Sequence, residues 1–267
     1  MEGAAAIPEA IRRLAEHPVV ELPVPPNWER VEQQGAVMVV TPFPLAQVVD
    51  PADLAVEDVA VAVAGMRSIG RERGKTVLAW WIAPEHDAFV SSLEALGLVN
   101  VDSPGFEAIE NAMALVTPPS ISVSEDVEVK LVESFDEFAG AERVRMEAFE
   151  MPPHMCEEME ARLAEHFAEY QDPANPGRGF IARLDGRIVG ASIAVAGAAG
   201  VNLFGGCVLP GARGRGVYQA LLRARWDFAV QRGTPALTVQ AGRMSKPIVE
   251  RLGFVQLAEV RVFIDNL

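Results

Sequence analysis

Cysteine is scarce in this sequence, which contains only Cys156 and Cys207. Two cysteines so far apart cannot form the dense disulfide framework of a small secreted domain, and they favour a reducing compartment. The first ten residues, MEGAAAIPEA, also lack the basic start and apolar centre of a signal peptide. We therefore expect a cytoplasmic protein.

Basic side chains are outnumbered, with 23 Lys and Arg against 37 Asp and Glu, a formal net charge of -14. Nucleic acids and anionic membranes are bound by wide faces of clustered basic charge. Neither is expected as a partner, although a small anionic ligand stays allowed because only the local field at its site matters. The sequence leaves a homodimer open.

The longest uncharged run covers residues 188–212 and matches a membrane span in length. Several glycines, Asn202 and Pro210 interrupt it, and GAAG at 197–200 separates two strand-length pieces, ASIAVA and VNLFGG. We predict a buried hairpin here and no membrane span.

The carboxyl-terminal half has the clearest pattern of predicted elements. Helical stripes recur around 136–149, 154–170 and 217–231, and Asp185-Gly186 suits a tight hairpin turn. The predicted order is a strand at 127–135, two helices, three antiparallel strands, the helix at 217–231, a strand at 234–241, a short helix at 247–252 and a last strand at 254–264. This order is typical of an α/β (α+β) domain with a mixed sheet.

The amino-terminal half contains a partial copy of that ending. A helix at 55–73 stops at Arg73-Gly74, a strand, a helix and another strand follow, and LEALGL at 93–98 aligns with VERLGF at 249–254. We predict two related domains, 1–117 and 127–267, joined by a linker at 118–126. Chance similarity between two α/β stretches is the alternative.

The segment CVLPGARGRGVYQALL is where the sequence indicates chemistry. Helices begin with backbone N–H groups that lack an intrahelical partner, and the helix dipole adds positive charge there. Gly214 and Gly216 allow close approach to the backbone, while Arg213 and Arg215 can make charge-assisted contacts with phosphate. The segment therefore predicts a site for a diphosphate, with a glycine-rich turn carrying solvated arginines as the alternative.

Two common phosphate motifs do not fit this segment. The nucleoside-triphosphate loop requires a Lys and a hydroxyl residue that are missing, and the dinucleotide fingerprint requires a third glycine where Gln219 stands. The segment instead resembles the pyrophosphate-binding motif V-x-P-x-x-[RQ]-x-x-G-x-[GA] of the GNAT acetyltransferase superfamily. Arg213 and Gly216 match it, Tyr218 replaces its last small residue, and the resemblance extends over roughly 127–266.

The resemblance implies two GNAT-like domains, each with a mixed, mostly antiparallel sheet flanked by helices, and acetyl-coenzyme A as co-substrate. It also implies a cleft where the strand before the loop splays from the next one. The residues implied to bind the cofactor are Cys207, Val208 and Leu209 against pantetheine, and Arg213, Gly214, Arg215, Gly216, Val217 and Tyr218 around the diphosphate. Gly205-Gly206 fits either a bulge that turns amides toward the thioester or simple space-saving in the sheet.

Catalytic residues are less clear than the cofactor loop. Many GNAT enzymes have a tyrosine near the closing Leu-Gly-Phe that protonates the thiolate, and Val249 stands there in this chain. Tyr218 is a substitute candidate, or else packs. Glu147 and Glu150 are weak candidates for a general base, with a solvated acidic surface as the alternative.

Two other sites are conceivable but disfavoured. Cys207 has no histidine near it in sequence, so covalent catalysis is not expected. His154, Cys156 and His166 match no common zinc spacing, and no metal is expected. In the first half, residues 54–57 align with the loop but lack its glycines and arginines, so that copy should not bind coenzyme A.

The resemblance implies acetyl transfer from acetyl-coenzyme A to an amine of a small-molecule acceptor, by direct attack within a ternary complex. The competing hypothesis is a non-catalytic acyl-coenzyme A sensor or scaffold, which Val249 and the absence of a clear base favour.

Overall fold

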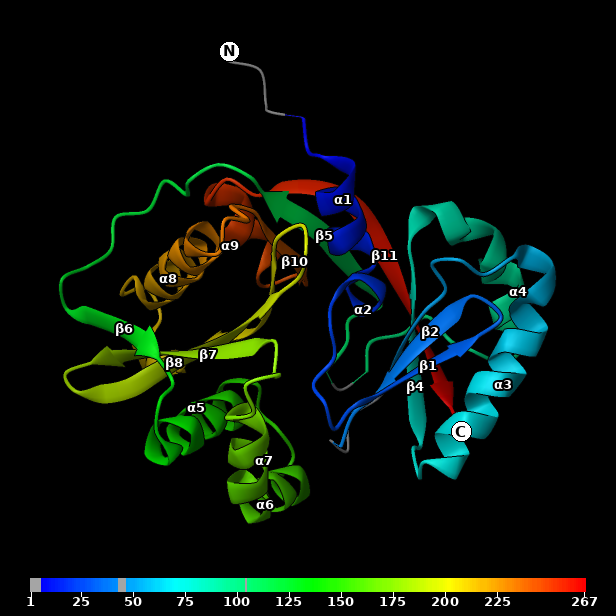
Figure 1. Cartoon of the computed structure of the whole chain (residues 1–267), viewed down its shortest axis with the longest axis horizontal. Helices are drawn as coiled ribbons and strands as arrows, with labels where there is room; N and C mark the ends of the chain where they lie inside the picture. Colours follow the sequence, from blue (N-terminus) through cyan, green and yellow to red (C-terminus); the bar gives the residue numbers. More distant parts are fainter. Residues whose placement is uncertain (1–5, 43–46, 104) are drawn as a thin grey trace. The chain divides into compact units, whose positions relative to one another are not determined.

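The computed structural model describes residues 6–42, 47–103 and 105–267 (Figure 1). Contacts within the described chain separate two compact units. Unit 1 consists of residues 115–238, and unit 2 combines residues 6–114 with residues 239–267. Each unit is built around a mixed, mostly antiparallel sheet.

Unit 1 is the part that carries the predicted cofactor loop. Its strands run in the order β10-β9-β8-β7-β6, antiparallel throughout except for the parallel pair β9 and β10. The elements are β6 Val127–Leu131, α5 Phe135–Ala148, α6 Pro153–Ala161, α7 Leu163–Tyr170, β7 Gly177–Leu184, β8 Arg187–Ala196, β9 Val201–Val208, η3 Pro210–Ala212, α8 Val217–Gln231 and β10 Leu237–Ala241, the last of which continues into unit 2.

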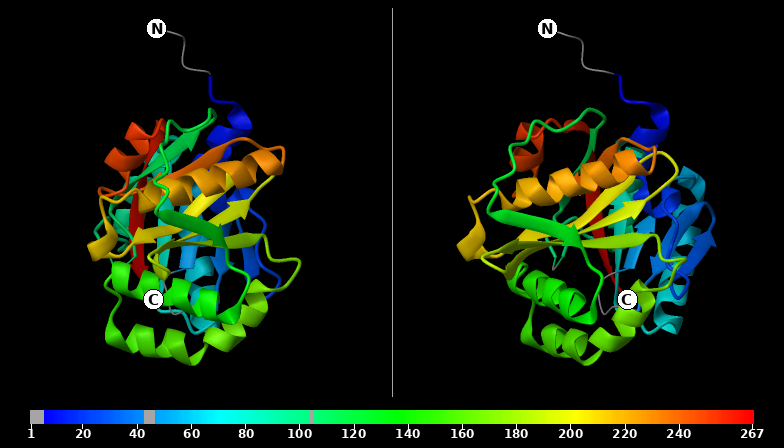
Figure 2. Two further views of the ribbon diagram at one scale, coloured as in Figure 1. Left: turned by 90° about the vertical axis from the view of Figure 1, so that its left-hand side faces the viewer. Right: turned by 60° about the vertical axis from the view of Figure 1, so that its left-hand side comes forward.

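Helices α5 and α8 cover opposite faces of the unit 1 sheet (Figures 1 and 2). The start of α5 is set by Ser134, whose hydroxyl accepts a hydrogen bond from the backbone N–H of Glu137 at 3.3 Å. The helix predicted at 154–170 is divided in two at Arg162, and its Phe167 packs against Phe138 and Tyr170. The apolar stripe there is thus part of the core.

The two predicted hairpins are confirmed. Asp185 and Gly186 have φ of 51° and 77°, as the tight turn between β7 and β8 requires. The uncharged run at 188–212 forms β8 and β9, which pair antiparallel, rather than a helix. In the described part of the chain no helix combines the length and apolar character needed to cross a bilayer.

Unit 2 contains elements that the sequence pattern did not reveal before residue 55. Its strands run in the order β1-β2-β3-β4-β11-β5, with β3 and β4 parallel and the other neighbours antiparallel. The elements are α1 Glu9–Glu16, α2 Pro18–Glu21, β1 Glu29–Gln33, β2 Ala36–Val40, β3 Gln47–Asp50, η1 Val56–Asp58, α3 Val59–Glu72, β4 Val77–Ile82, η2 Pro84–Phe89, α4 Val90–Ala95, β5 Ile109–Leu115, α9 Lys246–Arg251 and β11 Val255–Asn266.

Trp80 and Trp81 lie on β4 and are buried on opposite faces of the unit 2 sheet, because successive side chains of a strand alternate. Trp80 joins the cluster formed with α3 and α4, and Trp81 joins the cluster that includes Ala15 of α1. Both indoles therefore belong to the core.

The compact units do not follow the predicted boundary at 118–126. Residues 239–267 lie with residues 6–114 because β11 inserts between β4 and β5 and pairs antiparallel with both. A long carboxyl-terminal strand thus completes the sheet of the amino-terminal half. The division into two related domains, 1–117 and 127–267, stays a prediction, because the packing of the units does not show whether the two halves arose from one repeated domain.

The two halves nevertheless share local structure where their sequences align. In LEALGL the N–H of Leu98 donates to the carbonyl of Leu93 at 3.0 Å, and in VERLGF the N–H of Phe254 donates to that of Val249 at 3.1 Å. The helix ends at Gly74 and Gly233 are likewise left-handed, and β3–α3–β4 and β9–α8–β10 are both parallel units.

Candidate cofactor site

The predicted loop leads from the end of β9 into α8. Strand β9 ends at Val208, a short turn of helix follows at Pro210–Ala212, and α8 begins at Val217. Gly214 and Gly216 have φ of 77° and 81°, a left-handed conformation that other residues adopt only with strain. Glycine is therefore favoured at both positions for two reasons. It adopts the left-handed conformation without strain, and it lets a ligand approach the backbone closely.

Backbone N–H groups accumulate at the start of α8. Gly216 is the N-cap and offers no side-chain oxygen to the first turn. Within the described chain, the N–H groups of residues 214–219 donate to no protein acceptor, and the first that does is that of Ala220, at 2.9 Å from the carbonyl of Gly216. Together with the helix dipole, these donors make an anion-binding site.

Arg213 and Arg215 are both exposed beside this turn. The Nε of Arg213 lies 3.3 Å from the carbonyl oxygen of Val208, and Nη1 of Arg215 lies 4.0 Å from a carboxylate oxygen of Asp185. Neither contact is a buried ion pair, so both guanidinium groups can turn toward a phosphate at little cost.

Gly205 and Gly206 form a β-bulge. Ala191 pairs with Cys207 and Ile193 with Phe204, so both glycines lie opposite the single residue Ser192. Gly205 has a φ of 53°. Of the two alternatives for the glycine pair, a bulge or space-saving in the sheet, the structure has the bulge, and it lies just before the loop.

Two arginines approach the bulge from opposite faces of the sheet. A Cβ built on Gly205 would lie 3.5 Å from Nε of Arg145 on α5, and one built on Gly206 would lie 3.5 Å from Nη1 of Arg225 on α8. The Arg145 guanidinium forms an ion pair with Glu142. Positive charge therefore flanks the bulge on both sides.

Arg225 is the more unusual of the two because it is 1% exposed. Its Nε donates to the carbonyl of Leu221 at 3.1 Å, its guanidinium lies 5.9 Å from the ring centre of Tyr218, and its Nη2 has no hydrogen-bond partner in the structure. Burial lowers the pKa of this guanidinium.

Neither arginine was singled out from the sequence, although one signal was present. The helical stripe around 217–231 runs through Val217, Leu221, Ala224 and Phe228. Ala224 and Phe228 are only partly buried, and Arg225 and Trp226 are buried instead. The signal in the sequence was Arg225, a charged residue four positions after Leu221 and therefore on the same side of the helix.

The weak catalytic candidates differ in their surroundings. Glu147 and Glu150 are exposed at the end of α5, while Tyr218 is partly buried in the first turn of α8, with its ring centre 5.9 Å from the guanidinium of Arg225. Cys207 packs in the apolar cluster under α5, and burial raises the pKa of its thiol, which disfavours a nucleophilic thiolate. Val249 is fully buried in unit 2.

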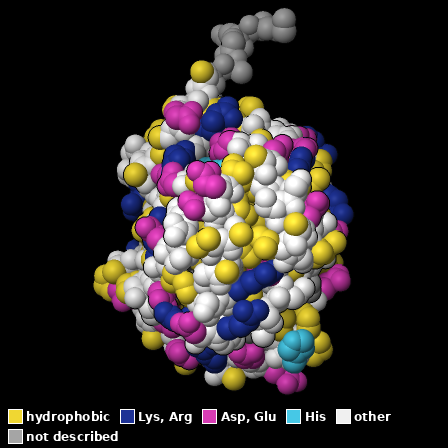
Figure 3. Space-filling view, turned by 90° about the vertical axis from the view of Figure 1, so that its right-hand side faces the viewer, with side chains coloured by type: hydrophobic (Ala, Val, Ile, Leu, Met, Phe, Trp, Pro, Cys, Tyr) yellow, Lys and Arg dark blue, Asp and Glu magenta, His cyan; other side chains and the backbone are white. Residues whose placement is uncertain are grey.

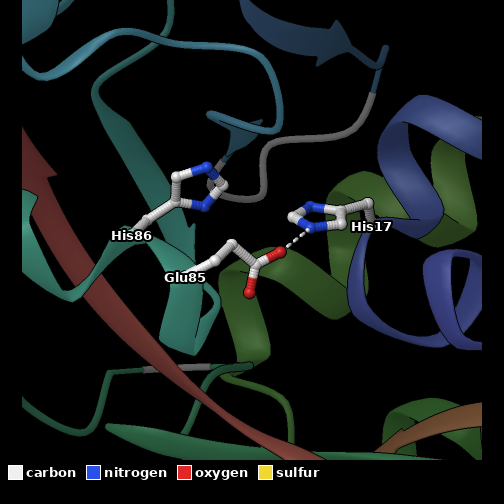
Figure 4. A group of neighbouring side chains, drawn as sticks. All are labelled: His17, Glu85 and His86. Atoms are coloured by element: carbon white, nitrogen blue, oxygen red, sulfur yellow. Dashed lines mark hydrogen bonds and ion pairs between the residues drawn. The ribbon is translucent and has the colours of Figure 1, made fainter.

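The histidines of the disfavoured zinc hypothesis do not come together with a cysteine: His154 is exposed on α6, whereas His166 is buried on α7. Within the described ranges, the group of side chains that could share an ion is instead His17, Glu85 and His86 in unit 2 (Figure 4). His17 lies too far from Glu85 and His86 in the sequence for a motif to reveal the group.

Part of this chain is similar to a known protein family. Residues 143–254 match the model of the Acetyltransferase (GNAT) family. The match supports acetyl transfer as the general reaction. A comparison with curated protein sequences gives no match.

Solved structures show that the fold of the whole chain recurs elsewhere. A GCN5-related N-acetyltransferase from Kribbella flavida is 17% identical, with a TM-score of 0.69 and coverage of 97% of this chain and 96% of that one. One from Sphaerobacter thermophilus is 17% identical, with a TM-score of 0.59 and coverage of 87% and 81%. A tandem GNAT protein from the clavulanic acid biosynthesis pathway is 15% identical, with a TM-score of 0.59 and coverage of 98% and 89%.

Proposed function

We propose that this chain transfers the acetyl group of acetyl-coenzyme A to an amine of a small-molecule acceptor, by direct attack in a ternary complex. The observation that carries the proposal is the row of N–H groups without a protein acceptor at residues 214–219, at the head of α8. A diphosphate there would be held by backbone donors, with Arg213 and Arg215 adding charge from the side.

The edge of β9 supports a place for the pantetheine arm. Pairing between β9 and β10 covers Val201 and Asn202, whereas β9 continues to Val208. The backbone of 203–208 therefore has no β10 partner along most of its length, and pantetheine amides could pair with it as a further strand would. Cys207, Val208 and Leu209 are the residues we propose for this contact.

The bulge then offers stabilisation of the reacting thioester. An amine that attacks the carbonyl places negative charge on its oxygen, and positive charge held in a buried environment stabilises such an oxyanion strongly. We assign that role to Arg225, which is buried and stands 3.5 Å from the Cβ position of Gly206. Tyr218, whose ring centre lies 5.9 Å from the guanidinium of Arg225, is our candidate for protonating the leaving thiolate.

The cofactor loop is tested by calorimetry with acetyl-coenzyme A. Arg213→Glu, alone and with Gly216→Val, should weaken binding by at least about tenfold, since each change removes a charge contact or a close approach. Arg223→Glu is a matched control, because Arg223 is an exposed arginine further along the same helix, paired with Asp227. Unchanged affinity in the Arg213 variant would contradict the assignment of the loop.

A second candidate function is a non-catalytic acyl-coenzyme A sensor. It is favoured by Val249, which is fully buried where many GNAT enzymes have a tyrosine, and by the exposure of Glu147 and Glu150. Thiol release with acetyl-coenzyme A and a panel of amines separates the two functions. Tight cofactor binding with no turnover on any amine favours the sensor.

A further inference from the structure

Unit 2 contains a compact cluster of ionisable side chains remote in sequence from the cofactor loop (Figure 4). His17 lies between α1 and α2, Asp50 is the last residue of β3, and Glu85 and His86 lie in the short helix after β4. Because β3 and β4 are parallel, their carboxyl ends meet at one edge of the sheet, where ligands commonly bind in α/β proteins.

The distances within the cluster are short. Nδ1 of His17 lies 2.8 Å from Oδ1 of Asp50, and Nε2 of His17 lies 2.7 Å from Oε1 of Glu85. One ligand atom each from His17, Glu85 and His86 lies within 4.8 Å of the other two. Figure 4 shows Glu85 and His86 on one segment and His17 on another, with Glu85 turned toward the ring of His17.

The cluster is buried on one side and open on the other. Asp50 is 0% exposed and His86 is 7% exposed, whereas the side chain of Glu85 is 48% exposed. Oδ2 of Asp50 and Nδ1 of His86 are buried without a hydrogen-bond partner in the structure. Such atoms are unusual in a folded protein, because an unpaired buried polar atom is destabilising.

We propose that His17, Glu85 and His86 bind a divalent transition-metal ion, for which zinc is the best chemical fit, with solvent in the remaining position. Two imidazoles and one carboxylate form a ligand set that zinc accepts, and the exposed side of Glu85 leaves room for water. Calcium and magnesium fit poorly, because they prefer an all-oxygen shell.

The neighbours of the two histidines fit the same role. Histidine ligands usually donate their second ring N–H to a carboxylate or a backbone carbonyl, which fixes the ring. Asp50 occupies that position for His17. The ring of His86 stacks on Phe89, with ring centres 4.9 Å apart. Each imidazole is thus oriented by a group that is not itself a ligand.

Two carboxylates contact the ring of His17 from either side. Nδ1 faces Asp50 and Nε2 faces Glu85. A divalent ion would lie between Nε2 of His17 and the Glu85 carboxylate and would displace the proton they share, as metals do when they bind protein ligands.

Binding an ion requires side-chain movement of about an ångström. Ligands placed at about 2.0–2.1 Å around a tetrahedral ion stand roughly 3.3 Å apart. The 2.7 Å contact between His17 and Glu85 must therefore open, and separations of up to 4.8 Å within the group must close. Glu85 can provide this shift because its side chain is half exposed.

The proposal is tested by cobalt titration of the full chain after treatment with a chelator. Cobalt(II) substitutes for zinc, and its visible absorption reports nitrogen and oxygen ligands. We expect one tightly bound equivalent, and affinity at least about tenfold lower in Glu85→Gln and in His86→Gln, since each removes one ligand. Zinc should also raise the melting temperature of the wild-type chain more than that of either variant.

His154→Gln is the matched control, because it removes an exposed histidine outside the cluster. Glu85→Gln is the decisive variant, since it keeps the buried pair of His17 and Asp50 and circular dichroism can verify its fold. The proposal is overturned if cobalt does not saturate the wild-type chain. Equal cobalt affinity in Glu85→Gln and the wild type, or loss of binding in His154→Gln instead, would also overturn it.

Discussion

Arg225 is the residue whose environment is least explained by packing. A buried guanidinium without a carboxylate partner is costly, and proteins often gain or keep stability when such a charge is replaced by an apolar side chain of similar size. Its retention next to Gly206 is better explained by chemistry at the bulge than by stability.

We therefore expect Arg225→Met to separate stability from activity. The free energy of unfolding in urea should stay within about 1 kcal/mol of the wild type or rise, since methionine fills the same space without a charge. Acetyl transfer should fall about 100-fold or more, the effect of removing one donor to an oxyanion. Arg223→Met, on the exposed side of the same helix, should change neither quantity. Full turnover in Arg225→Met would show that this side chain only packs.

At the level of elements, the seating of α8 on the sheet sets the position of the cofactor loop. A Cβ on Gly190 of β8 would lie 2.7 Å from Cγ1 of Val217, 3.1 Å from Cδ1 of Leu221 and 3.2 Å from the carbonyl oxygen of Cys207. Val217 is the first residue of α8. Gly190 thus lets the head of the helix approach the strand closely.

Gly190→Ala should for this reason both destabilise the protein and weaken the cofactor site. The added methyl pushes the first turn of α8 away from β8, and overpacking of this kind costs about 1–3 kcal/mol of unfolding free energy. Urea denaturation measures the first effect, and calorimetry with acetyl-coenzyme A measures the second. Gly211→Ala is the control, since a Cβ there meets nothing within 4 Å. If Gly190→Ala and Gly211→Ala bound acetyl-coenzyme A equally well, the position of α8 on the sheet would not affect the cofactor site.

At the level of the whole molecule, the main feature is that the last strand belongs to the unit formed by the first residues. Strand β11 pairs with both β4 and β5, and Asp265 near its end is 1% exposed and accepts hydrogen bonds from Arg67 at 2.8–3.0 Å. A paired buried carboxylate of this kind is strongly destabilising when its partner is lost. The carboxyl terminus is therefore a structural part of unit 2.

A chain that stops after Phe254 tests this division. Without β11 the facing edges of β4 and β5 are unpaired, so amide hydrogen exchange along 77–82 should lose its protection. The hairpin of β7 and β8, within unit 1, should retain more protection than β4 does. A chain that stops after Asn266 keeps β11 and serves as the control. Protection of β4 in the chain that stops after Phe254 would contradict the role given to β11.

The distribution of charge over the molecule also belongs to this scale. On the face shown in Figure 3, acidic, basic and hydrophobic side chains are intermixed, although the chain has a formal net charge of -14. Positive charge is thus not gathered on that face. The arginines that matter for the proposed function act locally, at the loop and at the bulge.

Much of unit 1 was predictable because its signals are local. Asp185-Gly186 indicates a tight turn, and Gly205-Gly206 is compatible with a bulge. Gly214 and Gly216 indicate a left-handed backbone before a helix, because other residues adopt that conformation only with strain. The loop motif and the order of elements likewise follow from spacing along the chain. None of these features needs knowledge of a distant segment.

The remaining features depend on contacts between distant segments, which local preferences cannot encode. Arg145 and Arg225 meet the bulge only because two helices cover opposite faces of one sheet, and His17, Glu85 and His86 meet only at the ends of two parallel strands. The pairing of β11 with β4 and β5 joins residues far apart in the chain. Burial and charge at these places are properties of the folded arrangement, because neighbours in space set the solvation of each group.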